Sequence, residues 1–293
     1  MKKSKLVYYS INIIVMIITG ILFFLDYRNV DETFLNVTWF SGTILIVTVV
    51  IVHFIKAFRL YLILYGSDMG FAEYMKIYCK TTPVSVLFPL KTGEFFRMYC
   101  HGKKLGNLLK GVVIILLDRF MDTIALVTMI LAIWLANGGE VTGVVYLLII
   151  FLAFVLLMYF AFPGMYRFWK KHIMCAKATK NKLAVLKLLD MFHRIYKEIA
   201  AVSKGRGILL YGLSIVAWSV EIGSIALVHG FRGDGKLTQA ISEYLMSAMS
   251  GNQSRELRQF VFASVILMVC VYIFIKITDL VKGRRGSNDN NCL

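Results

Sequence analysis

The sequence predicts an all-α integral membrane protein: a polytopic bundle of about six transmembrane helices plus a re-entrant or broken hairpin. Hydrophobic residues make up 58% of the 293 residues and charged residues only 17%, which is typical of a multispanning membrane protein. The mean hydropathy of +0.71 agrees with this class. Six apolar runs are long enough to cross a bilayer: Leu6–Leu25, Trp39–Ile55, Gly111–Ala136, Val141–Phe162, Ile208–Gly230 and Phe260–Ile277.

The basic residues between these runs are distributed asymmetrically. With the N-terminus inside, the predicted cytoplasmic segments 1–5, 56–110, 163–207 and 276–293 carry 27 of the 33 Lys and Arg residues. By the positive-inside rule both termini are cytoplasmic, and two inside termini require an even number of crossings. Because the net charge of +16 follows this pattern, it indicates a multi-pass protein of the cytoplasmic membrane and no nucleic-acid partner.

The first run begins like a signal peptide, with Lys2, Lys3 and Lys5 before its apolar stretch. The stretch is too long for a typical hydrophobic region, and no small-residue cleavage site follows Leu25. It is therefore predicted to be an uncleaved signal-anchor helix.

The segment 71–110 fits neither a span nor an ordinary loop. Its apolar stretch is too short to cross and contains Pro83 and Pro89, and proline breaks a helix. Because lysines flank the stretch, the sequence favours a re-entrant hairpin that enters the membrane from the cytoplasmic side. A pair of interfacial helices joined by ordinary turn prolines is the alternative.

The basic segment 163–207 contains an amphipathic helix. Its apolar residues recur at spacings of three and four: Val185, Leu188, Phe192, Ile195, Ile199 and Val202. We expect this stripe to pack on the rest of the protein, and binding to anionic lipid is the alternative.

The domain organisation follows from the lengths of these segments. Residues 1–281 are predicted to form a single transmembrane domain, and the polar residues 282–293 a disordered cytoplasmic tail. The longest segment outside the membrane has about 45 residues, close to the lower limit for an independently folding chain. No separate catalytic domain is therefore expected.

Charged residues inside the run 111–136 are the most informative feature of the chain. Asp118, Arg119 and Asp122 lie where lipid would otherwise surround the helix. A charge near the bilayer centre costs roughly 2.5–3.5 kcal/mol on insertion scales. These side chains are therefore expected to face protein, one another or a water-filled cavity.

A second polar set follows Pro89. Glu94 and Arg97 are three residues apart, so on a helix they share a face and can pair. Gly93, directly before them, allows a tight turn or a close approach of two backbones. Arg59, at the cytoplasmic end of the second run, is a further candidate, although snorkelling to the interface also explains it.

A third polar set consists of Trp218 and Glu221, near the middle of the run 208–230. Glu221 has no basic neighbour on its own helix, so we expect its partner to be Arg119 or Arg97. The alternative for all these residues is a purely structural one, in which inter-helix ion pairs fix the packing. A substrate or ion pathway is favoured, because ionisable groups inside membranes usually mark one.

Motifs for chemistry are missing from the sequence. It has no nucleophile elbow, no HExxH, no P-loop and no glycine-rich dinucleotide turn. No catalytic residue, cofactor or metal site is therefore predicted.

The order of the polar sets resembles the lysylphosphatidylglycerol synthase transmembrane family, also called the flippase-like domain family. That family shows an Arg closing its second helix, a Pro-x-x-x-Gly-Glu segment followed by Arg, an acid-Arg-x-x-Asp helix, and later a Trp near an acid. The residues that match, within 45–230, are Arg59, Pro89, Gly93, Glu94, Arg97, Asp118, Arg119, Asp122, Trp218 and Glu221. By this resemblance they are expected to bind substrate.

The chain departs from the family in one segment. Members usually carry a Pro-Gly-Gly-x-Gly-x-x-Glu motif before their last helices, whereas residues 231–257 contain no proline and no such motif. This part of the family's polar site is therefore expected to be missing or remodelled.

The resemblance implies a lipid-handling protein whose partners are membrane phospholipids. The expected activity is flippase-like translocation of a phospholipid or lipid-linked headgroup of the aminoacyl-phosphatidylglycerol type. The four acids Glu94, Asp118, Asp122 and Glu221 outnumber the nearby Arg97 and Arg119. This count predicts a surplus of carboxylates that could bind an ammonium group. Two alternatives stay open: the membrane subunit of a lysylphosphatidylglycerol synthase with a separate soluble transferase, and a passive scaffold. The chain itself is not expected to be an enzyme, although the family name points to phosphatidylglycerol lysyltransferase, and a homodimer is compatible with its sequence.

Overall fold

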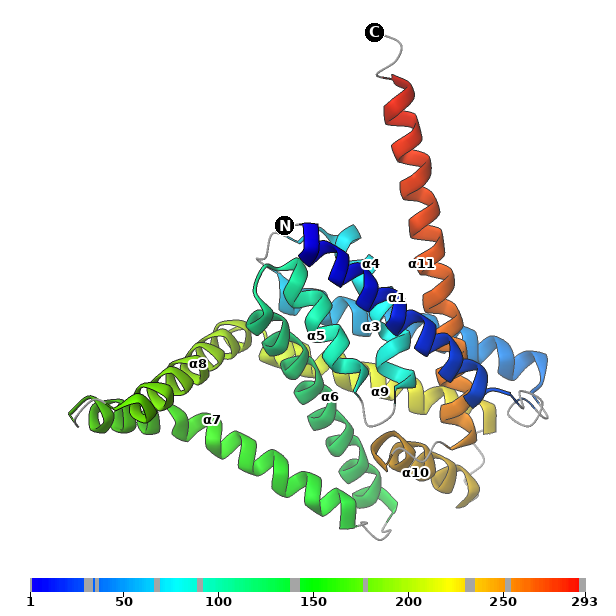
Figure 1. Ribbon diagram of the computed structural model, residues 1–293. Helices are drawn as coiled ribbons and strands as arrows, with labels where there is room; N and C mark the ends of the chain where they lie inside the picture. The colour runs from blue at the N-terminus through cyan, green and yellow to red at the C-terminus, as the bar shows by residue number, and fades with distance from the viewer. Residues whose placement is uncertain are drawn as a thin grey trace.

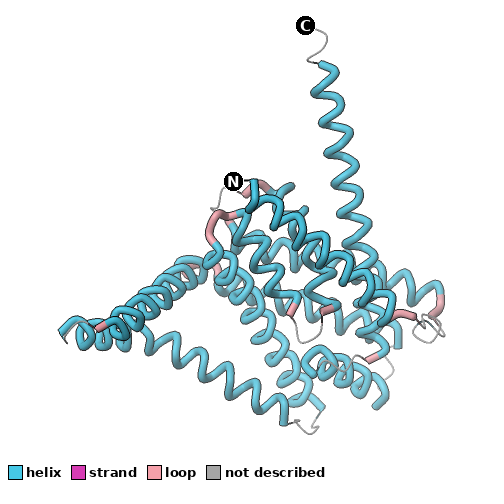
Figure 2. Tube along the Cα trace, viewed as in Figure 1, coloured by secondary structure: helices cyan, strands magenta, loops and turns pink. Residues whose placement is uncertain are grey.

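A computed structural model shows the protein as a set of helices joined by short connections (Figures 1 and 2). It describes residues 2–28, 34, 37–65, 69–88, 92–137, 143–175, 179–229, 235–250 and 254–289. Within these ranges there are ten helices and no strand. The helices are α1 Lys2–Asp26, α3 Trp39–Leu64, α4 Phe71–Leu87, α5 Gly93–Lys104, α6 Leu108–Asn137, α7 Gly143–Cys175, α8 Lys180–Ser203, α9 Gly207–His229, α10 Gly235–Ser250 and α11 Arg255–Asp289.

Five helices are long and apolar enough to cross a membrane: α1, α3, α7, α9 and α11. The sixth predicted span, 111–136, lies within α6, the helix that carries the charged residues of the run. The structure therefore confirms the prediction of an all-α, polytopic membrane protein. The side of the membrane on which each terminus lies stays a prediction.

Two helices extend further than the apolar runs predict. Pro163 lies inside α7, which continues past the predicted end at Phe162 to Cys175. Likewise α11 continues as a helix to Asp289, through most of the segment for which the sequence predicts disorder. Adding a residue to an existing helix avoids the cost of nucleation, which explains why both helices outlast their apolar stretches.

The segment 71–110 forms a helical hairpin from α4 and α5. Pro83 lies inside α4 and does not break it, and the helix ends at Leu87, six residues before α5 begins at Gly93. At the open end of the hairpin Lys104 Nζ lies 2.8 Å from Glu73 Oε1, which shows that α4 and α5 run antiparallel. Whether this hairpin enters the membrane stays a prediction.

The centre of the bundle is α3, which packs against α4, α6, α9 and α11. A buried apolar cluster joins these five helices through Leu60, Tyr74, Ile115, Leu210 and Met268. A second cluster joins α6, α9 and α10 and includes Leu126, Trp218 and Tyr244. The predicted charged residues lie on α3, α5, α6 and α9.

The helices α7 and α8 extend away from the bundle beside α6 (Figure 1). The Tyr166 ring of α7 stacks on His193 of α8 with the ring centres 3.9 Å apart. The predicted apolar stripe of α8 divides in two: Ile199 and Val202 pack against the bundle, whereas residues such as Phe192, 47% exposed, do not. Only the C-terminal half of the stripe therefore packs as expected.

Candidate functional site

Arg59 of α3 forms the buried centre of the site, with 1% of its surface exposed. Its Nη2 lies 2.7 Å from Asp118 Oδ1, and its Nε donates to the same oxygen at 2.9 Å. Its Nη1 donates to Asp122 Oδ1 at 2.8 Å and to Ser214 Oγ at 2.6 Å. Because Asp118 and Asp122 lie one turn apart on α6, both reach one guanidinium. These bonds hold α3, α6 and α9 together.

Arg97, Arg119 and Glu94 make looser contacts around this centre. Arg97 Nη1 lies 3.8 Å from Glu94 Oε2 and from Asp118 Oδ2. Arg119 Nε lies 3.1 Å from Glu94 Oε1 without the alignment of a hydrogen bond. Among the described residues, Arg97 Nε and Glu94 Oε2 are buried without a hydrogen-bond partner. These three side chains can therefore bind a further group without breaking a short ion pair.

Glu221 pairs with Lys56, and the expected pairing with Arg119 or Arg97 is wrong. Lys56 Nζ lies 2.7 Å from Glu221 Oε1, and Tyr244 OH donates to Glu221 Oε2 at 2.7 Å. Lys56 lies three residues before Arg59 on α3 and thus shares its face. Since α9 packs along α3, this face brings Lys56 to Glu221.

Trp218 lies beside the same lysine. Lys56 Nζ is 5.4 Å from the centre of the Trp218 ring, within the range of a cation–π contact. The Trp218 Nε1 atom is buried without a hydrogen-bond partner in the part of the chain that the structure describes. Trp218 and Glu221 of α9 are therefore both connected to the site by their contacts with Lys56.

The charges of the site are balanced. Its cations are Lys56, Arg59, Arg97 and Arg119, and its acids are Glu94, Asp118, Asp122 and Glu221. The predicted surplus of carboxylates is therefore wrong, because it left out the two cations that α3 supplies.

Gly93 sets the position of Glu94. A Cβ at Gly93 would lie 2.2 Å from the backbone oxygen of Val84, so α5 begins in direct contact with α4. Any larger residue would push α5 away and displace Glu94 and Arg97 with it. Pro89, the remaining predicted site residue, lies outside the described residues.

A cavity of about 90 Å³ lies among these side chains, and we call it the polar chamber. It is lined by His53, Lys56, Arg59, Tyr78, Thr82, Ser85, Val86, Arg97, Asp118, Arg119, Asp122, Phe260, Val261 and Ser264. A cavity of this size holds several waters, since about 10–15 Å³ is needed for each.

An apolar groove of about 470 Å³ adjoins the polar chamber between α3, α4 and α11. His53 and Tyr78 line both spaces, and His53 Nδ1 lies 3.2 Å from Tyr78 OH. At the outer edge of the groove Phe54 and Phe58 are 69% and 42% exposed. The apolar groove thus extends from the exposed apolar surface of the bundle to His53 and Tyr78, which lie between it and the charged residues.

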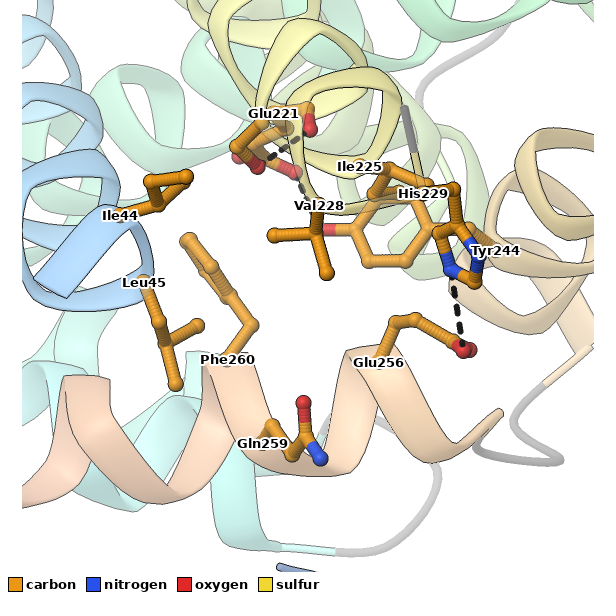
Figure 3. A pocket seen from close by; sticks show the side chains of 11 residues that line it. Ile44, Leu45, Glu221, Ile225, Val228, His229, Tyr244, Glu256, Gln259 and Phe260 are labelled. Atoms are coloured by element: carbon orange, nitrogen blue, oxygen red, sulfur yellow. Dashed lines mark hydrogen bonds and ion pairs between the residues drawn. The ribbon is translucent and has the colours of Figure 1, made fainter. Parts of the chain in front are cut away.

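A third cavity, of about 50 Å³, contains Glu221, and we call it the far cavity (Figure 3). Tyr244 and the contact between His229 Nε2 and Glu256 Oε1, at 3.9 Å, lie along its wall. Phe260 lines both the far cavity and the polar chamber. The Lys56–Glu221 pair and Phe260 therefore stand between the two spaces.

Sequence reasoning missed several residues of the site. Lys56 and Ser214 each lie on the same helix face as a predicted residue, so helical spacing could have identified them. Tyr244, on α10, has no such signal, because nothing in the sequence places α10 beside Glu221. Within the described ranges, no three His, Cys, Asp or Glu side chains are grouped so that they could hold a metal ion.

Three comparisons with known proteins were informative to different degrees. Neither the curated proteins nor the solved structures contain a match to it. A family model described as the lysylphosphatidylglycerol synthase TM region matches residues 11–252, which include all ten predicted site residues. This family supports a role connected with membrane lipid. The protein belongs to the lysylphosphatidylglycerol synthase transmembrane family.

Proposed function

We propose that the protein translocates a phospholipid across the cytoplasmic membrane, and that the headgroup of this lipid carries both a phosphate and an amine. Aminoacyl-phosphatidylglycerol is the type of lipid that fits. The observation that carries the proposal is that the polar chamber, lined by charged side chains, adjoins the apolar groove, with His53 and Tyr78 in the wall of both. An amphiphile needs both environments at once.

The balance of charges favours a headgroup with both signs. When the site is empty, its four cations and four acids are paired with one another. A headgroup with a phosphate and an ammonium can exchange partners and leave no charge alone. A headgroup with one charge would leave a buried group without its partner, which costs about 3–5 kcal/mol when the group is deeply buried.

The contact distances divide the site into a structural and a binding part. The bonds of Arg59 to its two aspartates, at 2.7–2.9 Å, fix the helices. Arg97 and Arg119, with longer contacts, are the residues that we assign to the phosphate, since guanidinium groups bind phosphate oxygens in pairs. Glu94 and Asp122 are assigned to the amine. Asp122 belongs to both parts, because it bonds Arg59 through Oδ1 while its side chain is 15% exposed.

The apolar groove is assigned to an acyl chain. It keeps the chain in apolar surroundings while the headgroup enters the polar chamber. Because the polar chamber holds only several waters, translocation requires it to widen. The Lys56–Glu221 pair and Phe260 are the groups that have to move to connect it with the far cavity.

The test is a lipid-accessibility measurement in proteoliposomes. Fluorescent phosphatidylglycerol and its lysylated counterpart are quenched from outside in vesicles with wild type, Asp122→Asn or Asp190→Asn. Asp190 lies on α8, remote from the polar chamber, so its variant removes the same charge elsewhere. We expect the protected signal to disappear faster with the lysylated lipid than with phosphatidylglycerol. Asp190→Asn should show the same fast rate, and Asp122→Asn should show the slow rate of empty vesicles. Equal, slow rates in all samples and in empty vesicles would contradict the proposal and favour the synthase-subunit alternative.

A further inference from the structure

A groove of about 680 Å³ between α1, α4 and α11 is separate from the site described above. It shares no lining residue with the polar chamber, the apolar groove or the far cavity. Its volume lies in the range of roughly 300–1,000 Å³ that is typical of small-molecule sites. One wall is apolar and includes Ile13 and Ile17 of α1, which are 60% and 57% exposed.

Three lysines, Lys76, Lys80 and Lys276, line the same groove. Lys76 Nζ lies 2.6 Å from Asp279 Oδ2. Lys80 donates to the neutral Asn12 Oδ1 at 2.6 Å, and within the described ranges neither Lys80 nor Lys276 has a carboxylate within 4.0 Å. The groove therefore carries positive charge that the described residues do not compensate.

The groove also has the aromatic residues of a membrane–water boundary. Tyr8 and Tyr272 line it beside the lysines, and the Nζ atoms of Lys80 and Lys276 lie 5.3 and 5.8 Å from the centres of these two rings. Tyrosine rings and basic side chains are enriched at headgroup level. The positive-inside pattern places all of these residues on the cytoplasmic side, where the leaflet contains anionic lipid.

We propose that this groove binds one anionic phospholipid of the cytoplasmic leaflet. Its phosphate lies between Lys80 and Lys276, and one acyl chain lies along Ile13 and Ile17. Charge complementarity favours an anionic headgroup over a zwitterionic one, because Lys80 and Lys276 have no described carboxylate within 4.0 Å to release. The apolar wall favours a lipid over free phosphate.

The test is lipid retention by the full-length protein, purified in detergent and analysed by native mass spectrometry. The probes are phosphatidylglycerol and phosphatidylcholine at equal concentration, with inorganic phosphate as a competitor. We expect wild type to retain one phosphatidylglycerol in preference to phosphatidylcholine. In Lys80→Gln/Lys276→Gln the apparent dissociation constant should rise at least about tenfold, as expected when charge-assisted hydrogen bonds are lost.

Two controls separate the groove from general charge attraction. Lys187→Gln/Lys197→Gln removes two exposed lysines from α8 and should retain the lipid as wild type does. Ile17→Trp fills the apolar wall while all lysines stay, and it should weaken retention. The translocation test changes the polar chamber and this one changes a separate groove with no lining residue in common, so failure of the translocation proposal and failure of this one can be told apart.

Three outcomes would overturn the inference. The first is that Lys80→Gln/Lys276→Gln or Ile17→Trp retains phosphatidylglycerol as strongly as the wild-type protein does. The second is an equal loss in the α8 control, which would show attraction to basic charge anywhere on the protein. The third is displacement of the lipid by inorganic phosphate at a comparable concentration, which would show that the lysines bind free phosphate.

Discussion

Lys56 Nζ lies 2.7 Å from Glu221 Oε1, and this contact joins α3 to α9 between the polar chamber and the far cavity. Tyr244 OH supports the same carboxylate from α10. Glu221 is buried, whereas the side chain of Lys56 is 23% exposed. The lysine is therefore the partner that can leave, and its release would open a route from one cavity to the other.

Removing Lys56 should make the polar chamber accessible from the far cavity. The measurement uses Ser264→Cys, a cysteine in the wall of the polar chamber, in a protein whose five native cysteines are replaced. With Lys56 present, an impermeant thiol reagent on the outer side should react slowly. With Lys56→Gln the rate should rise, and an unchanged rate would show that the pair does not close the polar chamber.

Arg59 and Arg119 should differ in what they support. Arg59→Gln leaves two buried carboxylates without their cation and should lower the free energy of unfolding by about 3–5 kcal/mol. Arg119 has a side chain that is 40% exposed, and its contacts are longer. Arg119→Gln should therefore lower the free energy of unfolding by only about 1 kcal/mol or less. Unfolding in mixed micelles measures both. Equal destabilisation would contradict the division into a structural and a binding part.

Substitution of Gly93 should displace α5. In Gly93→Ala the added Cβ meets the backbone of Val84 at 2.2 Å, and such overpacking typically costs 1–3 kcal/mol, here at least about 1 kcal/mol. Gly223→Ala in α9 meets nothing within 4 Å, so it should stabilise its helix by up to about 1 kcal/mol. Thermal unfolding of the two variants gives the comparison, and equal midpoints would refute the close approach of α4 and α5.

Blocking the apolar groove should affect only lipids with acyl chains. Met75 lies in its wall, and Met75→Trp narrows it without changing the charge of the polar chamber. The translocation rate of a long-chain lipid should fall, while binding of the deacylated headgroup stays unchanged. Met165→Trp, on α7 outside the bundle, is the control of equal size. The role assigned to this groove would be contradicted if Met75→Trp impaired both translocation of the long-chain lipid and binding of the deacylated headgroup, or if it impaired neither.

Much of the site could be predicted because charge inside a membrane is costly. Asp118, Asp122 and Arg59 had to find partners in the protein, and helical spacing placed the two aspartates on one face. Which partner each residue finds depends on which helices lie side by side, and spacing along one helix does not determine that. The pairing of Glu221 with Lys56 was missed for this reason.

The fold shows the same limit. Apolar runs predicted the spans, but Pro83 did not end its helix as a helix breaker would, and Pro163 likewise lies inside α7. Proline is tolerated in a membrane bundle because neighbouring helices and hydroxyl groups satisfy the freed backbone. Thr82 and Ser85 donate to the carbonyl groups of Tyr78 and Thr82 in the same turns of α4, whereas the carbonyl that loses its helical donor at Pro83 is that of Cys79.

The central claim, that a lipid headgroup occupies the polar chamber, is tested most directly by protection of Ser264→Cys. Its rate of modification by a small thiol reagent is measured in vesicles with lysylated phosphatidylglycerol and in vesicles with phosphatidylglycerol alone, whose headgroup has a phosphate and no amine. The account predicts a rate lower by about tenfold with the lysylated lipid, as expected for a ligand held by charge-assisted hydrogen bonds, and loss of that protection in Arg119→Gln. Equal rates in both vesicles would show that the lysylated headgroup does not occupy the polar chamber in preference to phosphatidylglycerol, and would contradict the account.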